Sequence, residues 1–132
     1  MRRSVLDSYA VLAFLFKEKG HEKVVTALEK AAESDRPLLI VAPNWAEVRY
    51  QVERKAGAEA WRRTREKLLG LPVEVVPADQ ELSEQVGEIK ARRKMSLADC
   101  FAAALAKTRK ADLYTGDPEF REVQKEVRII WL

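Results

Sequence analysis

Apolar residues along this chain follow two patterns, and the patterns predict which segments form strands and which form helices. Short runs rich in apolar residues, typical of buried strands, lie at residues 4–6, 38–41, 73–76, 112–115 and 127–132. Between these runs the apolar positions recur at steps of three and four residues, which is the spacing of one helix face. Helices are therefore predicted over residues 8–19, 24–34, 45–55, 58–69, 79–93 and 96–109, with a helical turn after residue 118.

This order of elements predicts the fold class. Strands that alternate with helices need crossover connections, which place the strands parallel in one sheet and the helices on both of its faces. We predict an α/β protein with a three-layer α/β/α arrangement and a central, mostly parallel sheet of about five strands. Since the 132 residues show no repeat and no linker-like stretch, residues 1–132 are expected to form a single domain.

Composition narrows the class of protein only slightly. The formal net charge of +3 is compatible with a nucleic-acid partner, but many other proteins share it. One cysteine and one histidine exclude a disulfide framework and a zinc site of Cys and His ligands, and they favour the reducing cytoplasm. The apolar stretch at residues 9–16 is shorter than the roughly 20 residues that a membrane helix needs, so no membrane association is expected.

Two carboxylates follow strands, and each can be explained as a helix cap. Asp7 comes directly after the first predicted strand, and Asp117 precedes Pro118 after the fourth. An aspartate at the N-cap satisfies free backbone N–H groups, and proline suits the first helical turn.

Two further carboxylates lie one turn into predicted helices. Glu47 follows Asn44 by three residues and Asp99 follows Ser96 by three, so both pairs have the spacing of a capping box. Capping therefore accounts for any one of the four acids taken alone.

Taken together, the four acids indicate a metal site. In an open parallel sheet the functional crevice lies beyond the carboxyl ends of the strands, where Asp7, Glu47 and Asp117 are expected. Carboxylates that converge there repel each other, and a divalent cation relieves that repulsion. Mg²⁺ and Mn²⁺ accept oxygen ligands of this kind.

Four segments resemble the motifs of PIN-domain proteins in order and spacing, and the resemblance covers essentially the whole chain. They are VLDSYAVLAFL, PNWAEV, SLADCFAAALA and LYTGDPEF. Length and basic charge are similar to the VapC-type toxin branch, the ribonucleases of toxin–antitoxin pairs. By resemblance, Asp7, Glu47, Asp99 and Asp117 correspond to the acidic quartet of the family, and Thr115 corresponds to its hydroxyl position.

The resemblance implies a Mg²⁺- or Mn²⁺-dependent endoribonuclease that forms a homodimer and is inhibited by a cognate VapB-like antitoxin. We expect Asp7 and Asp99 to be central metal ligands and Asp117 to complete the site. Glu47 is expected to bind a second metal ion or to orient the attacking water. Cations near the crevice are expected to contact RNA phosphates, and the candidates are Arg49, Arg92, Arg93 and Lys94.

Two alternatives remain open from the sequence. One is a PIN-like domain that binds RNA or serves as a scaffold without catalysis. The other is a receiver-type signalling domain, which also carries an acidic Mg²⁺ pocket on a sheet of this size. A receiver needs paired acids after its first strand, whereas Asp7 stands alone there.

Overall fold

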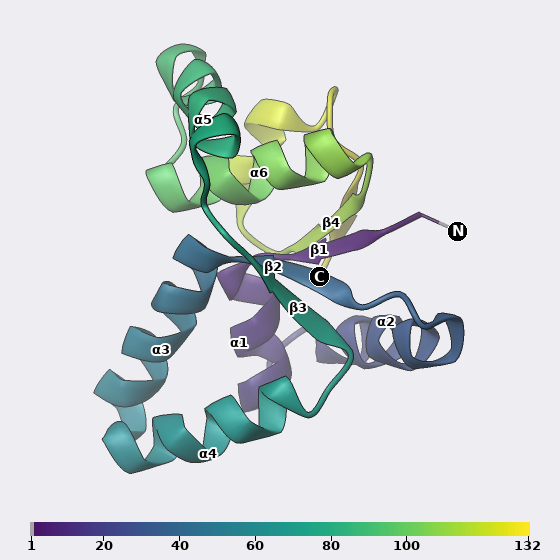
Figure 1. Ribbon diagram of the computed structural model, residues 1–132, viewed down its shortest axis with the longest axis vertical. Helices are drawn as coiled ribbons and strands as arrows, with labels where there is room; N and C mark the ends of the chain where they lie inside the picture. Colours follow the sequence, from purple (N-terminus) through teal and green to yellow (C-terminus); the bar gives the residue numbers. More distant parts are fainter. Residues whose placement is uncertain (1) are drawn as a thin grey trace.

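The computed structural model describes residues 2–132, which form five β-strands, six α-helices and one short 3-10 helix (Figure 1). The strands are β1 (Ser4–Leu6), β2 (Leu38–Val41), β3 (Val73–Val76), β4 (Asp112–Thr115) and β5 (Ile129–Trp131). The helices are α1 (Ser8–Phe16), α2 (His21–Ser34), α3 (Ala42–Ala56), α4 (Ala58–Leu69), α5 (Gln80–Arg92), α6 (Leu97–Arg109) and the 3-10 helix η1 (Pro118–Val123). The sequence predicted every one of these elements.

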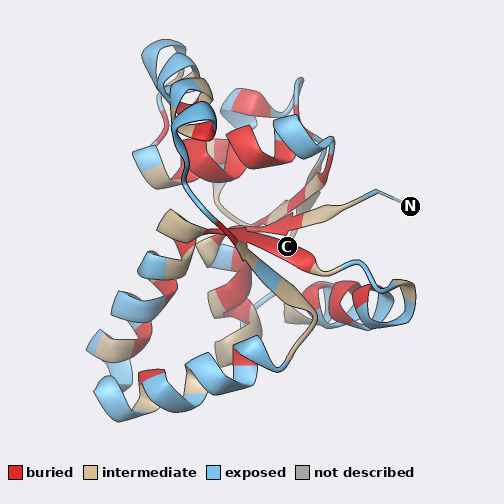
Figure 2. Cartoon of the chain, viewed as in Figure 1, coloured by how far each residue is buried: buried red, intermediate tan, exposed pale blue. Residues whose placement is uncertain are grey.

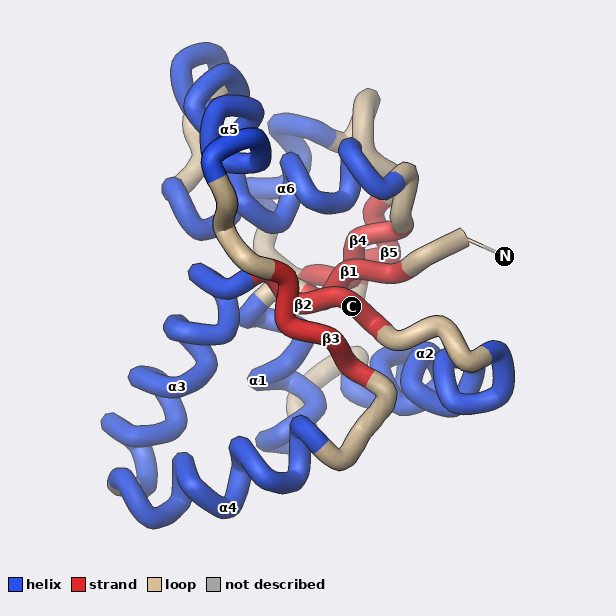
Figure 3. Tube along the Cα trace, viewed as in Figure 1, coloured by secondary structure: helices blue, strands red, loops and turns tan. Residues whose placement is uncertain are grey.

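The five strands make one sheet in the order β3-β2-β1-β4-β5, and all four neighbouring pairs are parallel (Figure 3). The most N-terminal strand is therefore central, with Val5 paired to Leu39 on one side and to Leu113 on the other. This order confirms the predicted parallel α/β fold. It also rules out the receiver alternative, because receiver domains have the order 2-1-3-4-5.

Strand residues alternate between two hydrophobic cores, one on each face of the sheet. Val5 and Leu39 pack in the core under α5, α6 and η1, whereas Leu6 and Ile40 pack in the core under α1 to α4. Side chains of successive strand residues point to opposite faces, so each buried strand serves both cores. Figure 2 shows this burial along the central strands and on the inner sides of the helices. The layers are therefore α/β/α, as predicted.

Three helices begin or end away from their predicted limits. The first helix ends at Phe16 rather than near residue 19, because Lys17 adopts a left-handed backbone with φ 53°. The second begins at His21 rather than at residue 24. The third begins at Ala42, three residues before the predicted start, with Val41 as its N-cap. Within residues 2–132 there is no helix of the length and apolarity needed to cross a membrane.

Gly20 marks a close approach between the α1–α2 turn and the last residue of the chain. It is the N-cap of α2 and has a φ of 85°. A Cβ atom at this position would lie 2.5 Å from the Cβ of Leu132. Glycine is needed there for its backbone freedom and for its small volume.

Candidate active site

The predicted site lies at the carboxyl edge of the sheet, where three neighbouring strands end. Asp7 directly follows β1, Thr115 is the last residue of β4, and Glu47 lies in the helix that follows β2. Because β2, β1 and β4 are adjacent and parallel, their ends come together at one edge.

Asp7 is the most enclosed of the predicted residues, with 1% of its surface exposed. Its Oδ1 accepts a hydrogen bond from the backbone N–H of Ala10 at 2.8 Å, which confirms its N-cap role, and its Oδ2 accepts one from Thr115 Oγ1 at 2.5 Å. Burial raises the pKa of Asp7 to about 7, although both of these bonds lower it, and the charges of Asp117 and Glu47 raise it further. The folded protein therefore resists ionisation of this carboxyl group.

Thr115 joins two of the acids through one hydroxyl group. Besides donating to Asp7, its Oγ1 accepts a hydrogen bond from the backbone N–H of Asp117 at 3.0 Å, and the residue has no exposed surface. The Asp117 carboxylate in turn accepts a bond from the Glu119 backbone N–H at 2.9 Å and caps η1, as predicted. Gly116 lies between Thr115 and Asp117, and a Cβ atom at this position would lie 2.3 Å from the Tyr9 ring. Glycine therefore lets this loop pack closely against α1.

Glu47 is held by two side chains, and the predicted capping box with Asn44 is wrong. Because α3 starts at Ala42, Asn44 already lies inside the helix and cannot cap it. Its Nδ2 instead donates to Glu47 Oε1 at 3.1 Å and to the Ala98 carbonyl of α6 at 3.3 Å. Ser8 Oγ donates to the same Glu47 oxygen at 2.9 Å. Asn44 is fully buried, and its Oδ1 has no hydrogen-bond partner among the described residues.

Asp99 opens α6 beside a fifth acid that the sequence analysis missed. Half of the predicted capping box is present, since Ser96 Oγ accepts from the Asp99 backbone N–H at 3.2 Å. The return bond goes elsewhere, because the Ser96 N–H donates to Glu119 Oε1 at 2.5 Å. Burial, a side-chain hydrogen bond with Glu119 and the charges of Asp117, Asp7 and Glu119 raise the pKa of Asp99 to about 9.

The pKa values of this pair shift in opposite directions. Burial alone would raise the pKa of Glu119, but hydrogen bonds from Asp99 and Ser96 and the charge of Lys90 lower it. A proton on Asp99 beside an ionised Glu119 is therefore the favoured arrangement. The only sequence signal for Glu119 was its place two residues after Asp117, which is ambiguous because η1 is a short, irregular turn.

The electrostatics of this edge are unusual for a folded protein. Each of the four predicted acids either has a raised pKa or contributes to raising that of a neighbour. Across residues 2–132, no lysine, arginine or histidine forms an ion pair with Asp7, Glu47, Asp99 or Asp117. The repulsion is therefore relieved by protonation and by hydrogen bonds from neutral groups.

The donor set suits a hard divalent cation, but the side chains are not arranged around one. All the candidate ligands are carboxylate oxygens, which Mg²⁺ and Mn²⁺ prefer. Among the described residues, however, no three Asp, Glu, His or Cys side chains are grouped so that they could hold a metal ion. The hydrogen bonds described above engage Asp7, Glu47 and Asp99 with protein groups instead.

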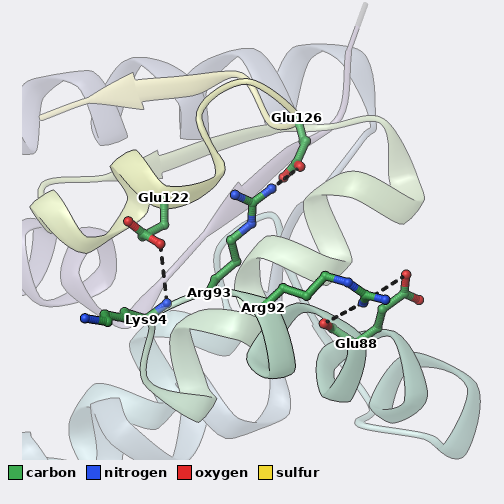
Figure 4. A network of polar contacts seen from close by, with 6 residues as sticks. All are labelled: Glu88, Arg92, Arg93, Lys94, Glu122 and Glu126. Atoms are coloured by element: carbon green, nitrogen blue, oxygen red, sulfur yellow. Dashed lines mark hydrogen bonds and ion pairs between the residues drawn. The ribbon is translucent and has the colours of Figure 1, made fainter.

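Three of the four predicted RNA-contacting cations are engaged in ion pairs. Arg49 Nε is 3.4 Å from Glu53, Arg92 is 3.6 Å from Glu88 and Arg93 is 2.5 Å from Glu126. Lys94 uses its backbone N–H to bind Glu122, and its side chain extends away from these partners (Figure 4). The residues 92–94 lead directly into Ser96, so this basic segment runs beside Glu119 and η1.

Comparison with known protein families identifies one match. The sequence model of the PIN domain matches residues 4–126, which is most of the chain. No curated protein sequence matches the chain significantly.

Several solved structures share the fold at low sequence identity. The DNA-bound VapBC from Salmonella typhimurium is similar with a TM-score of 0.77 and 19% identity, covering 98% of both chains. VapBC2 from Rickettsia felis, bound to a promoter DNA fragment, has a TM-score of 0.75 and 16% identity over 96% of both chains. VapC20 from Mycobacterium tuberculosis, a sarcin–ricin loop cleaving toxin, has a TM-score of 0.65 and 20% identity, covering 89% of this chain and 92% of that one.

Proposed function

Because the chain belongs to the PIN domain family, we propose that it is a divalent-metal-dependent endoribonuclease and the toxin of a VapBC-type toxin–antitoxin pair. One observation carries the proposal. Four carboxylates from separate parts of the chain gather at the carboxyl edge of the sheet, and within residues 2–132 no cationic side chain forms an ion pair with any of them. A fold that keeps such a cluster at a cost in stability does so for binding or chemistry.

Asp7 and Asp99 are proposed as central ligands for Mg²⁺ or Mn²⁺, with Asp117 completing the site and Glu47 binding a second ion or orienting water. When bound, such ions neutralise phosphate charge, activate water and stabilise the leaving oxygen. Metal binding requires Asp99 to give up both its proton and its hydrogen bond with Glu119. Binding is therefore coupled to proton release.

The surrounding side chains have positioning roles in this proposal. Thr115 fixes one oxygen of Asp7 and, through the Asp117 backbone, the start of η1. Ser8 and Asn44 fix one oxygen of Glu47, and none of the residues 2–132 donates a hydrogen bond to its other oxygen. These neutral donors orient the carboxylates without cancelling their charge.

Several features extend the proposal to substrate and partners. The exposed Lys94 and its neighbours Arg92 and Arg93 supply cations in the segment that leads to η1, and Arg49 is exposed on α3. Phosphate contacts of this kind bind RNA without reading its sequence. The single histidine argues against a mechanism that uses two histidines and the 2′-hydroxyl as nucleophile, so the expected products carry a 5′-phosphate and a 3′-hydroxyl. The VapBC structures with this fold support a VapB-like antitoxin as a partner of this chain. We further propose that the chain forms a single domain, that it assembles as a homodimer and that it acts in the cytoplasm.

The proposal is tested with Asp7→Asn and Asp99→Asn in an RNA cleavage assay that contains Mg²⁺ or Mn²⁺. Each variant is expected to lose at least 10²-fold in rate while it stays folded, and EDTA should abolish wild-type cleavage. The matched control is Asp79→Asn, because Asp79 caps α5 through a 2.9 Å bond to the Leu82 N–H but lies outside the acidic cluster. Wild-type cleavage rates in folded Asp7→Asn or Asp99→Asn would refute the proposed mechanism. If the wild type itself did not cleave RNA with Mg²⁺ or Mn²⁺ present, the alternative of a non-catalytic RNA-binding or scaffold domain would be favoured.

A further inference from the structure

A second charged region lies at the opposite edge of the sheet, where the strands begin. A cavity of about 210 Å³ opens there between α2 and the first residues of the sheet, on the side where β1 enters in Figure 1. Its wall is formed by the starts of β1, β2 and β4, by one face of α2 and by the residue before β5. The charged residues that line it are Arg2, Arg3, Lys30, Arg36, Arg128 and Asp112.

Five cations thus share this cavity with one carboxylate. Asp112 is already in contact with two of them, at 2.5 Å from Arg2 and 3.9 Å from Arg128. Within residues 2–132, neither Arg3 nor Lys30 has a carboxylate at ion-pair distance. The charges of Arg3 and Lys30 are therefore not balanced by a carboxylate of the described residues.

Arg3 gives the most specific signal. It belongs to the segment that leads into β1 and is partly buried, and one of its terminal nitrogens donates to the Pro37 carbonyl at 3.4 Å. Its Nε is buried, yet no acceptor among the described residues bonds to it. A buried donor without an acceptor normally costs about 1–3 kcal/mol, so such groups usually mark a missing partner.

We propose that this cavity binds a phosphate group. A phosphate monoester carries a charge of about −1.5 to −2 at neutral pH and three acceptor oxygens, so it can meet donors that converge from several directions. A carboxylate offers only two oxygens in one plane and one charge for the two charges of Arg3 and Lys30. The phosphate monoester can belong to a small molecule such as a nucleotide. A backbone phosphodiester of RNA, which has one charge and two free oxygens, is the other source of phosphate that the probes distinguish.

The test measures binding of inorganic phosphate in EDTA, so that no metal ion at the acidic edge can bind the probe. Phosphate is expected to raise the melting temperature and to give a calorimetric binding isotherm, whereas chloride or acetate at the same ionic strength should do neither. The double variant Lys30→Gln/Arg128→Gln should weaken phosphate binding at least tenfold, since both side chains are exposed and their loss leaves the core intact. Arg65→Gln, an exposed arginine on α4, is the control and should bind as the wild type does.

Two further probes identify the source of the phosphate. If adenosine 5′-monophosphate binding falls in the double variant while a 12-nucleotide RNA binds unchanged, the site serves small phosphorylated molecules. If RNA affinity falls and its dependence on salt concentration becomes shallower, the site holds a backbone phosphate. The proposal is overturned if phosphate has no more effect than chloride or acetate, or if the double variant and the Arg65→Gln control bind it equally well.

Discussion

Asp7→Asn should make the metal-free protein more stable, and the gain should grow with pH. The pKa of Asp7 rises from 3.8 to about 7 on folding, so the folded state binds more protons than the unfolded state between these pH values. Stability from this group is therefore greatest at low pH and falls as pH rises through 7, opposite to the usual behaviour of an aspartate. By thermodynamic linkage, this difference in pKa lowers the free energy of unfolding by about 4 kcal/mol above pH 7 and by about 2 kcal/mol at pH 5.

Asparagine keeps the shape of the side chain and removes this penalty. Its oxygen can still accept from the Ala10 N–H, whereas the short bond from Thr115 must reverse its direction or weaken. Allowing about 1–2 kcal/mol for that change, we expect Asp7→Asn to gain roughly 2–3 kcal/mol relative to wild type at pH 8 and close to zero at pH 5. For a chain of this length the gain at pH 8 is a rise in melting temperature on the order of 10 °C.

The assay is thermal or urea unfolding in EDTA at pH 5 and pH 8, with Asp79→Asn as the control for loss of a charged cap. Asp79 is exposed, so that substitution should change stability by no more than about 1 kcal/mol at either pH. Added Mn²⁺ should stabilise the wild type and leave Asp7→Asn unchanged, because only the wild type keeps its proposed ligand. If Asp7→Asn were destabilised equally at both pH values, ionisation of Asp7 would not destabilise the folded state, and the prediction would be refuted.

Three other predictions follow from the site. Asn44→Ala should lower the cleavage rate about 10–100-fold without unfolding the protein, since Glu47 loses one of its two hydrogen-bond donors. Asn44→Asp should not restore the rate, because a carboxylate cannot donate a hydrogen bond. Cleavage assays and circular dichroism of both variants test this prediction. Calorimetry of Mn²⁺ binding at pH 7 in two buffers of different ionisation enthalpy should show release of about one and a half protons, about one from Asp99 and about half of one from Asp7. No net release would contradict the raised pKa values of these two acids. Phe120→Ala should cost about 3–5 kcal/mol in unfolding free energy, because the ring is fully buried under η1; a cost below 1 kcal/mol would mean that η1 is not anchored there.

The fold could be predicted from sequence because each strand is a short apolar run between recognisable helices. Parallel strands with both faces covered have apolar side chains at nearly every position, as Leu38 to Val41 do, and this signal does not depend on distant contacts. Helix limits were less accurate. Lys17 ends α1 by adopting a left-handed conformation that nothing in its side chain requires, so this limit leaves no trace in the sequence. Ala42 begins α3 without a capping side chain, and Pro43 in the first turn is the local signal for this start.

The candidate site was predicted in part, and the residues whose roles were missed depend on tertiary contacts. Asp7 and Asp117 follow strands and cap the next helices, so their place could be read from local sequence. Asn44 has the spacing of a cap, and only the packing of α3 against α6 turns it toward Glu47 and Ala98. Glu119 joins the site through a bond to the backbone of Ser96, which lies 23 residues away along the chain.

The bond from Asn44 to Ala98 has a mechanical consequence. Glu47 is carried by α3 on one side of the sheet and Asp99 by α6 on the other, so a sliding motion of the two helical layers would change the separation of these acids. Asn44 fastens the two layers at the edge where that motion would matter, and it does so from a fully buried position. The span of the acidic cluster is thereby set by one amide group that is not itself acidic.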